Sequence, residues 1–122
     1  MSFWKVKLRK TDRMFSEYIR KRDNWTCQYS FKDYSENKGG LHCSHYFGRG
    51  HENVRFDPDN CVALSAYHHK RLGHGEGREE YKELMLKRLG QDGFDRLDIR
   101  AHTHKKRDDA LDEVIIKELL RT

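Results

Sequence analysis

Three neighbouring stretches of the chain decide its fold: Leu41-His-Cys-Ser-His-Tyr-Phe47, Asn60-Cys-Val-Ala-Leu64 and Ser65-Ala-Tyr-His-His-Lys-Arg-Leu72. The first two are short, rich in apolar residues and separated by a glycine-containing loop, which is typical of two extended strands. Ser65 stands where the N-cap of a short helix is expected, and Gly73 follows the third stretch as a helix stop would. The sequence therefore predicts a loop and hairpin over residues 23–50 with 41–47 as the outgoing strand, a second short strand or extended segment at 60–64, and a short helix directly after it.

Apolar residues at helical spacing flank this unit on both sides. We expect an amphipathic helix over residues 12–22, with Thr11 or Asp12 as its N-cap, and two or three helices over about 77–121, the first ending at Gly90. We expect their apolar stripes to face the core; the stripes are Met14, Phe15, Tyr18 and Ile19, then Tyr81, Leu84, Met85 and Leu89, then Leu111, Val114, Ile115 and Leu119. The predicted fold class is α+β, with a single domain over residues 1–122. It comprises a basic arm and helix (1–22), a hairpin-and-helix core (about 23–74) and C-terminal helices (about 77–121).

The composition restricts the function classes. The chain has 122 residues, 37% of them charged, and a net charge of +5. No apolar run approaches the roughly 18 residues that a membrane span needs, so we expect no membrane association. The N-terminus lacks the apolar segment of a secretory signal, and the three cysteines are too few and odd in number for a disulfide scaffold. These features indicate a cytoplasmic protein in a reducing compartment.

The positive charge is concentrated at the N-terminus. Residues 1–22 hold eight basic and two acidic side chains, so the remaining hundred residues are close to neutral. Such a patch favours a polyanionic partner, and phosphate contacts would bind DNA without sequence preference. A solvated helix face is the alternative interpretation. The candidate contacts in this segment are Lys5, Lys7, Arg9, Lys10, Arg20 and Arg22, with Lys21 as a further basic neighbour.

The histidines are concentrated in the predicted core. Six of the eight fall between positions 42 and 74, and histidine is both a metal ligand and a general base near neutral pH. A strand histidine, His45, is followed by Asn60 and then by His69 and His74 on or beside the short helix. We interpret this set as a metal pocket, although surface histidines on a polar loop remain the alternative for any one of them.

The residues His45, Asn60 and His69 resemble the HNH (ββα-metal, His-Me finger) nuclease motif. That family places a histidine on the first strand, an asparagine in the linking loop and a metal-binding residue on the following helix. The resemblance implies that His45 is the general base and that His69, with His74 beside it, binds one divalent metal ion. Asn60 would either orient the hairpin or bind the metal. The implied metal is Mg²⁺ or Mn²⁺, with Zn²⁺ or Ni²⁺ as substitutes in vitro.

The likeness extends to phage recombination endonucleases of the NinG (Rap) type. Phe15-Ser-Glu-Tyr-Ile-Arg-Lys-Arg-Asp23 is similar to the first helix of that group. Ser44-His-Tyr-Phe-Gly-Arg-Gly50 and Arg55-Phe-Asp-Pro-Asp-Asn60 are similar to its central signature, and the Tyr81 to Gly90 helix fits as well. By this resemblance Arg49 and Arg55 would contact phosphates next to the cleaved bond.

Two departures from the family pattern are visible. This branch usually carries two Cys-x-x-Cys pairs around a structural zinc, whereas this chain has Cys27-Gln-Tyr-Ser30 and Ser65-Ala-Tyr-His68. Because a structural zinc needs four protein ligands, we predict that it is absent, the alternative being an improvised site that uses Cys43 and Cys61. We expect aromatic residues to fill the space: Trp25, Tyr29, Phe31, Tyr34 and Tyr46. The second departure is Ser44, which stands where many members have an Asp or His metal ligand; His42, Asn60 or a water would replace it.

The sequence therefore predicts a metal-dependent DNA endonuclease that hydrolyses phosphodiester bonds, acting on branched or structured DNA in phage recombination. If the chain is phage-encoded, its compartment would be the host cytoplasm. The apolar residues near 111–120 would allow a homodimer that cuts two strands. The alternative is a non-catalytic DNA-binding or regulatory module on a degenerate HNH scaffold, which the missing Cys-x-x-Cys pairs and Ser44 favour.

Overall fold

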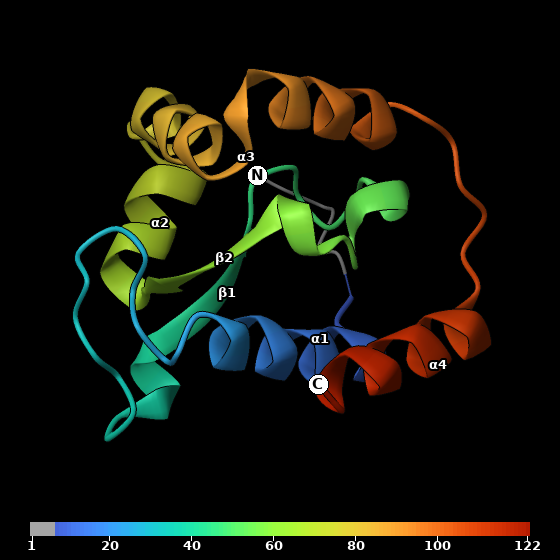
Figure 1. Ribbon diagram of the computed structural model, residues 1–122, viewed down its shortest axis with the longest axis horizontal. Helices are drawn as coiled ribbons and strands as arrows, with labels where there is room; N and C mark the ends of the chain where they lie inside the picture. The colour runs from blue at the N-terminus through green and yellow to red at the C-terminus, as the bar shows by residue number, and fades with distance from the viewer. Residues whose placement is uncertain (1–6) are drawn as a thin grey trace.

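A two-stranded antiparallel hairpin lies at the centre of the molecule, with helices on both sides (Figure 1). The structure is a computed structural model that describes residues 7–122. Strand β1 (Leu41–His45) pairs with β2 (Cys61–Ser65), and the register places His45 opposite Cys61. Helix α2 (Ala66–His74) follows β2 directly. The predicted α+β class and the ββα order of the core are thus confirmed.

Helix α2 begins as predicted but ends later. The Ser65 hydroxyl accepts a hydrogen bond from the His68 backbone N–H at 3.3 Å, which confirms the predicted N-cap. The helix then continues through Gly73 to His74, so the predicted stop at Gly73 is wrong. Gly73 instead faces the hairpin, because a Cβ placed on it would lie 3.8 Å from the Ser44 hydroxyl. An added Cβ would make an ordinary van der Waals contact there, so the helix continues past Gly73 without requiring glycine at this position.

The first helix, α1 (Lys10–Arg22), packs against one face of the hairpin. It begins before the predicted N-cap, and Asp12 lies inside it. Arg9 is the N-cap, and its backbone N–H donates a hydrogen bond to the carboxylate of Asp12 at 2.7 Å. Asp12, in the first turn, thus supplies a hydrogen-bond partner for a backbone N–H at the start of the helix. Phe15 and Ile19 are buried, as their helical spacing predicted.

Helix α3 (Arg78–Ala101) covers the opposite side together with α2. Its backbone breaks at Gly90, where φ is +72° and ψ is 169°, so the predicted end of a helix at Gly90 corresponds to a sharp interruption. Only glycine adopts such a positive φ without strain. Three short 3₁₀ turns complete the loops: η1 (Lys38–Gly40), η2 (Glu52–Val54) and η3 (Pro58–Asn60).

The last helix, α4 (Asp109–Leu120), lies beside α1 (Figure 1). Its buried apolar contact with α1 is Ile116, whereas Leu111, Val114 and Ile115 are 49%, 60% and 45% exposed. The predicted core stripe of this helix is therefore wrong for Leu111, Val114 and Ile115, whereas its fourth member, Leu119, packs against the cluster of Ile116 as predicted. None of the helices within residues 7–122 combines the length and apolar character needed to cross a membrane.

Two separate apolar clusters hold these layers together. One joins α1, α4 and the hairpin face that carries Cys43 and Cys61; the other joins the opposite side of the hairpin to α2 and α3. Four of the five aromatics expected to fill the space of a structural zinc pack against the second cluster: Trp25, Tyr29, Tyr34 and Tyr46. Phe31 does not, because its side chain is 76% exposed.

Candidate functional site

His45, the predicted general base, ends β1 and is half-buried. Its Nε2 lies 2.8 Å from the backbone carbonyl oxygen of Arg55. A carbonyl oxygen only accepts hydrogen bonds, so Nε2 carries the proton and Nδ1 holds the free lone pair. Burial and the nearby positive charge of Arg49 lower the pKa of His45 to about 4, so the imidazole is neutral at pH 7. The ring is thus fixed in one tautomer with one nitrogen able to accept a proton.

Asn60 lies at the end of the loop between the strands and is fully buried. Its Nδ2 donates to the carbonyls of Phe47 at 2.9 Å and Val54 at 3.1 Å, while its Oδ1 accepts from the Phe47 backbone N–H at 2.9 Å. The side chain therefore clamps both ends of the loop that follows His45. Of the two roles left open by the sequence, these contacts are those of hairpin positioning.

Three histidine rings meet on the α2 side of the hairpin. The ring centroids of His42 on β1 and His69 on α2 are 5.2 Å apart, and those of His69 and His74 are also 5.2 Å apart. The Nδ1 atom of His69 is buried and has no hydrogen-bond partner among the described residues. Burial, followed by the charges of His42 and His74, lowers the pKa of His69 to about 4. His69 and His74 come together as the sequence predicted, but the strand histidine beside them is His42. His45, which was expected there, points to the other face of the hairpin, with Cys43 and Cys61.

Ser44, at the position of the expected first-strand ligand, points toward α3. Its hydroxyl lies 2.6 Å from the hydroxyl of Tyr81, and both residues are fully buried. Burial raises the pKa of Tyr81. The neighbouring His42, which the sequence offered as a substitute ligand, contacts His69 instead. On this strand His42 is therefore better placed than Ser44 to join His69.

Arg55, predicted to contact a phosphate, lies inside the protein with 2% of its surface exposed. Its guanidinium donates to both carboxylate oxygens of Asp12 and to the carbonyl of Lys7 at 2.9 Å. The phosphate contact is therefore corrected: Arg55 ties the loop to α1. Arg49 remains at the surface edge, with its side chain 34% exposed, and its charge lowers the pKa of both His45 and His69.

Arginines of α1 are also engaged within the fold. Arg22 binds the Asp23 carboxylate at 3.0 and 3.1 Å and donates to the carbonyls of Pro58 at 2.8 Å and Cys61 at 2.7 Å. These contacts hold α1 to β2, and the predicted DNA contact of Arg22, whose side chain is 24% exposed, stays a prediction. Arg20 lies over the Trp25 ring at 5.0 Å and bonds the Ser16 carbonyl, but keeps partial exposure.

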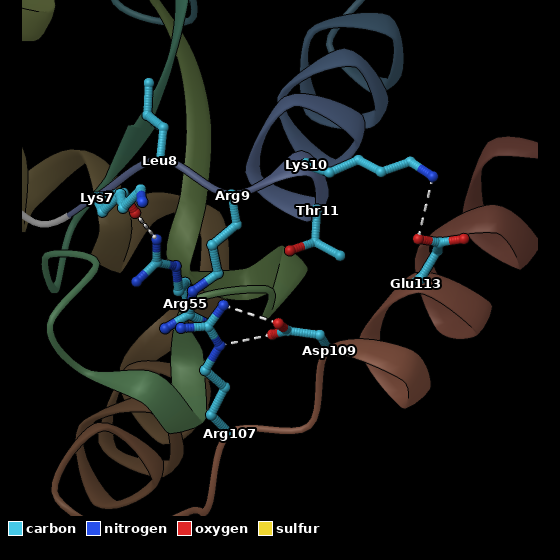
Figure 2. Close-up of a pocket in the computed structure, with 9 residues that line it drawn as sticks. All are labelled: Lys7, Leu8, Arg9, Lys10, Thr11, Arg55, Arg107, Asp109 and Glu113. Carbon is cyan, nitrogen blue, oxygen red and sulfur yellow. Dashed lines mark hydrogen bonds and ion pairs between the residues drawn. The ribbon is translucent and has the colours of Figure 1, made fainter.

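A cavity of about 510 Å³ lies between the start of α1 and α4, with basic side chains in its wall (Figure 2). Most of these side chains have acidic partners, and Figure 2 shows Lys10 and Arg107 each reaching a carboxylate of α4. The pairs are Arg9–Glu52 (2.9 Å), Lys10–Glu113 (3.3 Å) and Arg107–Asp109 (2.7 Å). Arg9 therefore pairs with Glu52 in this structure, and its predicted phosphate contact stays a prediction. Lys7 and Lys10 stay exposed, and Lys5 lies outside the described residues.

The four positions of the expected zinc site do come together without forming a four-ligand set. Cys27 is buried, and its Sγ accepts from the Ser30 backbone N–H at 3.5 Å. Ser65 Oγ lies 2.8 Å from His68 Nδ1. Hydrogen bonds thus link Cys27 to Ser30 and Ser65 to His68, the two pairs of positions where the family carries Cys-x-x-Cys. The absence of a structural zinc remains a prediction.

A different group went unnoticed in the sequence. Within residues 7–122, Cys43, His45 and Cys61 form the one group of three metal-binding side chains whose ligand atoms all lie within 4.8 Å of one another. Cys43 and His45 alternate on β1, and the strand register places Cys61 opposite His45. The sequence shows that Cys43 and His45 share one face of a strand. It does not show which residue of the second strand lies opposite His45, and that pairing is what brings in Cys61.

Comparisons with known proteins add no identification: no family model, no curated protein and no solved structure matches this chain.

Proposed function

We propose that this chain is a metal-dependent endonuclease that hydrolyses phosphodiester bonds in DNA. The observation that supports it most is the placement of three side chains on one ββα unit. His45 ends β1, Asn60 immediately precedes β2 and His69 lies in α2. The order of these residues along the ββα unit is the one that the resemblance to HNH nucleases implies, although strand alternation places His45 on the face of Cys43 and His42 on the face that contacts His69. The cleavage of phosphodiesters is carried by that resemblance.

His45 has the properties that a general base requires. Its Nδ1 lone pair can accept the proton of an attacking water, since Nε2 donates to the Arg55 carbonyl. Its pKa of about 4 keeps the ring neutral across the physiological range, at the cost of intrinsic basicity. Asn60 acts as a positioning residue, because its hydrogen bonds fix the backbone that follows His45.

The donor set on the α2 side fits a transition metal better than magnesium. His42, His69 and His74 offer imidazole nitrogens, and the buried Nδ1 of His69 lacks a partner among the described residues. As the rings lie, their nitrogens do not all come within 4.8 Å of one another, so the side chains would have to rotate to share one ion. Imidazole suits zinc, nickel, copper and iron, whereas Mg²⁺ and Mn²⁺ prefer oxygen ligands, which Ser44 and Asn60 do not offer freely here. A bound divalent ion would polarise the phosphoryl group and stabilise the leaving oxygen.

The finer proposals concern the substrate. Arg49, Lys7, Lys10 and Arg20 keep exposed charge for phosphate contacts, and α1 also presents the exposed Arg13 and Lys21. We retain branched DNA of phage recombination as the substrate class implied by the NinG-type resemblance, with the cytoplasm as the compartment. A homodimer formed through the exposed apolar residues of α4 would bring two sites to one junction.

The test is cleavage of end-labelled duplex and four-way-junction DNA with Mg²⁺, Mn²⁺, Co²⁺, Ni²⁺ or Zn²⁺. His45→Ala should lose about 10²–10⁴-fold of the cleavage rate, the usual contribution of a general base. His104→Ala, an exposed histidine in the linker before α4, is the matched control and should keep the wild-type rate. Equal activity of wild type and His45→Ala, or no cleavage with any metal, would contradict the proposal.

A second candidate is the non-catalytic DNA-binding or regulatory module. The observation that favours it is the Ser44–Tyr81 hydrogen bond, which occupies the position where many HNH nucleases hold a metal ligand. Salt-dependent DNA binding by wild type and His45→Ala alike, without cleavage by either, would support this candidate over the nuclease. Cleavage that depends on His45 would exclude it.

A further inference from the structure

Cys43, His45 and Cys61 share the hairpin face that packs against α1. Cys43 and Cys61 are 5% and 1% exposed and belong to the apolar cluster of Phe15 and Ile19. The ligand atoms of the three side chains all lie within 4.8 Å of one another. A histidine that serves as general base in the proposed function is therefore flanked by two buried sulfur ligands.

The chemistry of this group differs from that of the three-histidine group. Two thiols and one imidazole are ligands of zinc and other soft divalent ions, and a Cys₂His set leaves the fourth tetrahedral position open. Ligand atoms in a tetrahedral zinc site lie roughly 3.3–3.8 Å apart, so each separation would close by no more than about 1.5 Å on binding. No carboxylate belongs to the group, which disfavours Mg²⁺.

The surroundings of His45 prepare it as a ligand. Its Nε2–H donates to the Arg55 carbonyl, which orients the ring and leaves Nδ1 as the nitrogen with a lone pair. Arg55 is itself fixed by Asp12, so this carbonyl is held in place. The same lone pair is the one that the proposed hydrolysis uses. Metal binding and general-base catalysis therefore compete for one atom.

The group is separate from the three-histidine group. Successive side chains on β1 alternate between the two faces of the hairpin. His42 contacts His69 of α2 and Ser44 bonds Tyr81 of α3, whereas Cys43 packs with residues of α1. Cys27 belongs to the other apolar cluster, where its Sγ accepts a backbone hydrogen bond. Cys27 therefore serves as the control cysteine in the metal-binding experiments below.

We infer that Cys43, His45 and Cys61 form an inhibitory site for Zn²⁺, which binds through two thiolates and one imidazole nitrogen with water as the fourth ligand. Binding releases the two thiol protons to solvent and occupies the lone pair of His45. The inhibitory consequence rests on the proposed function, whereas the binding of the metal does not.

Binding is tested by Co²⁺ titration of the reduced full-length protein. Thiolate ligands produce a sulfur-to-cobalt charge-transfer band, which we expect in wild type and in Cys27→Ala. Cys43→Ala and Cys61→Ala should weaken Co²⁺ binding at least about tenfold and reduce the band. A band that persists in both of these variants, or one that is lost in Cys27→Ala, would overturn the site.

X-ray absorption of zinc-loaded wild type provides a measurement that needs no variant. Two sulfur neighbours at about 2.3 Å are expected. A shell without sulfur would overturn the assignment even if the cysteine variants failed to fold.

Inhibition is tested by comparing each protein with itself in the cleavage assay, at a fixed Mn²⁺ concentration, with and without one equivalent of Zn²⁺. Zinc should lower the rate of wild type and of Cys27→Ala at least about tenfold, and that of Cys61→Ala much less. Equal zinc inhibition of wild type and Cys61→Ala would overturn the inhibitory role. Absence of cleavage in every protein would overturn the proposed function and this role with it, while the cobalt band would still decide whether the site exists.

Discussion

Arg55 and Asp12 form a buried ion pair that joins the candidate site to the first helix. The Arg55 Nε lies 2.9 Å from Asp12 Oδ1, Nη2 contacts the second carboxylate oxygen, and the two side chains are 2% and 1% exposed. The backbone carbonyl of Arg55 meanwhile accepts from His45. One residue thus connects the orientation of His45, the proposed general base, to the packing of α1.

Asp12→Ala should destabilise the protein by about 3–5 kcal/mol, because it leaves the Arg55 guanidinium buried without a counter-charge. Urea unfolding followed by circular dichroism measures this. Glu52→Ala is the control, because the Arg9–Glu52 pair has the same chemistry but greater exposure, at 14% and 19%. It should cost about 1 kcal/mol or less. Equal costs for the two variants would show that the burial of the Asp12 pair has no energetic consequence.

Asn60→Ala should destabilise the protein by about 2–4 kcal/mol. It removes the partner of two buried carbonyls and one N–H, and buried groups without partners are costly. Amide hydrogen exchange locates the effect, because the Phe47 N–H should lose its protection first. Asn53→Ala is the matched control from the same loop, since within residues 7–122 the Asn53 side chain makes one hydrogen bond, to the Arg100 carbonyl at 2.9 Å. A smaller loss for Asn60→Ala than for Asn53→Ala would contradict the clamp.

The unfolding free energy should depend on pH through His45 and His69. Both have a pKa of about 4 in the folded protein, against about 6.5 in an unfolded chain. Between these values the unfolded state binds more protons, so stability is full above about pH 6.5 and falls as the pH drops toward 4. Each residue should contribute on the order of 1–3 kcal/mol to this fall.

Urea unfolding at several pH values measures the slope. His69→Gln should flatten it, whereas His104→Gln, at an exposed linker position, should leave it unchanged. An unchanged slope in His69→Gln would show that the burial of this ring does not govern its titration.

The local elements of the fold were readable from the sequence because short-range rules determine them. The Ser65 N-cap, the two strands and the interruption at Gly90 each depend on residues within a few positions. The role of Arg55 was not readable in this way. Its partner Asp12 lies 43 positions away, and nothing local distinguishes a buried arginine from a phosphate-binding one.

Helix α4 illustrates the same limit. Periodicity predicted the helix, but the face that is buried depends on how α4 docks against α1. The pair Lys10–Glu113 and the apolar contact of Ile116 fix that docking, and they leave Val114 exposed. Likewise, the group of Cys43, His45 and Cys61 exists only through the register of the hairpin.

The Ser44–Tyr81 hydrogen bond allows a double-mutant test of why Ser44 occupies the expected ligand position. Each single change, Ser44→Ala or Tyr81→Phe, leaves the other buried hydroxyl without its partner and should cost about 1–3 kcal/mol. The double variant should cost much less than the sum of the two, because no unpaired hydroxyl remains. Thermal and urea unfolding of the four proteins give the coupling energy.

Tyr46→Phe is the control for the loss of a tyrosine hydroxyl. Its ring packs edge-on against Tyr81 at 5.1 Å, yet its hydroxyl has no hydrogen-bond partner within residues 7–122, so the change should cost about 0.5 kcal/mol or less. If the losses of unfolding free energy in the two single variants add up in the double variant, the two hydroxyls do not depend on each other. The contact with α3 would then not explain why serine stands at position 44. Strong coupling would show that Ser44 serves to hold α3 against the hairpin. His42 would then be the side chain of β1 best placed to bind a metal together with His69.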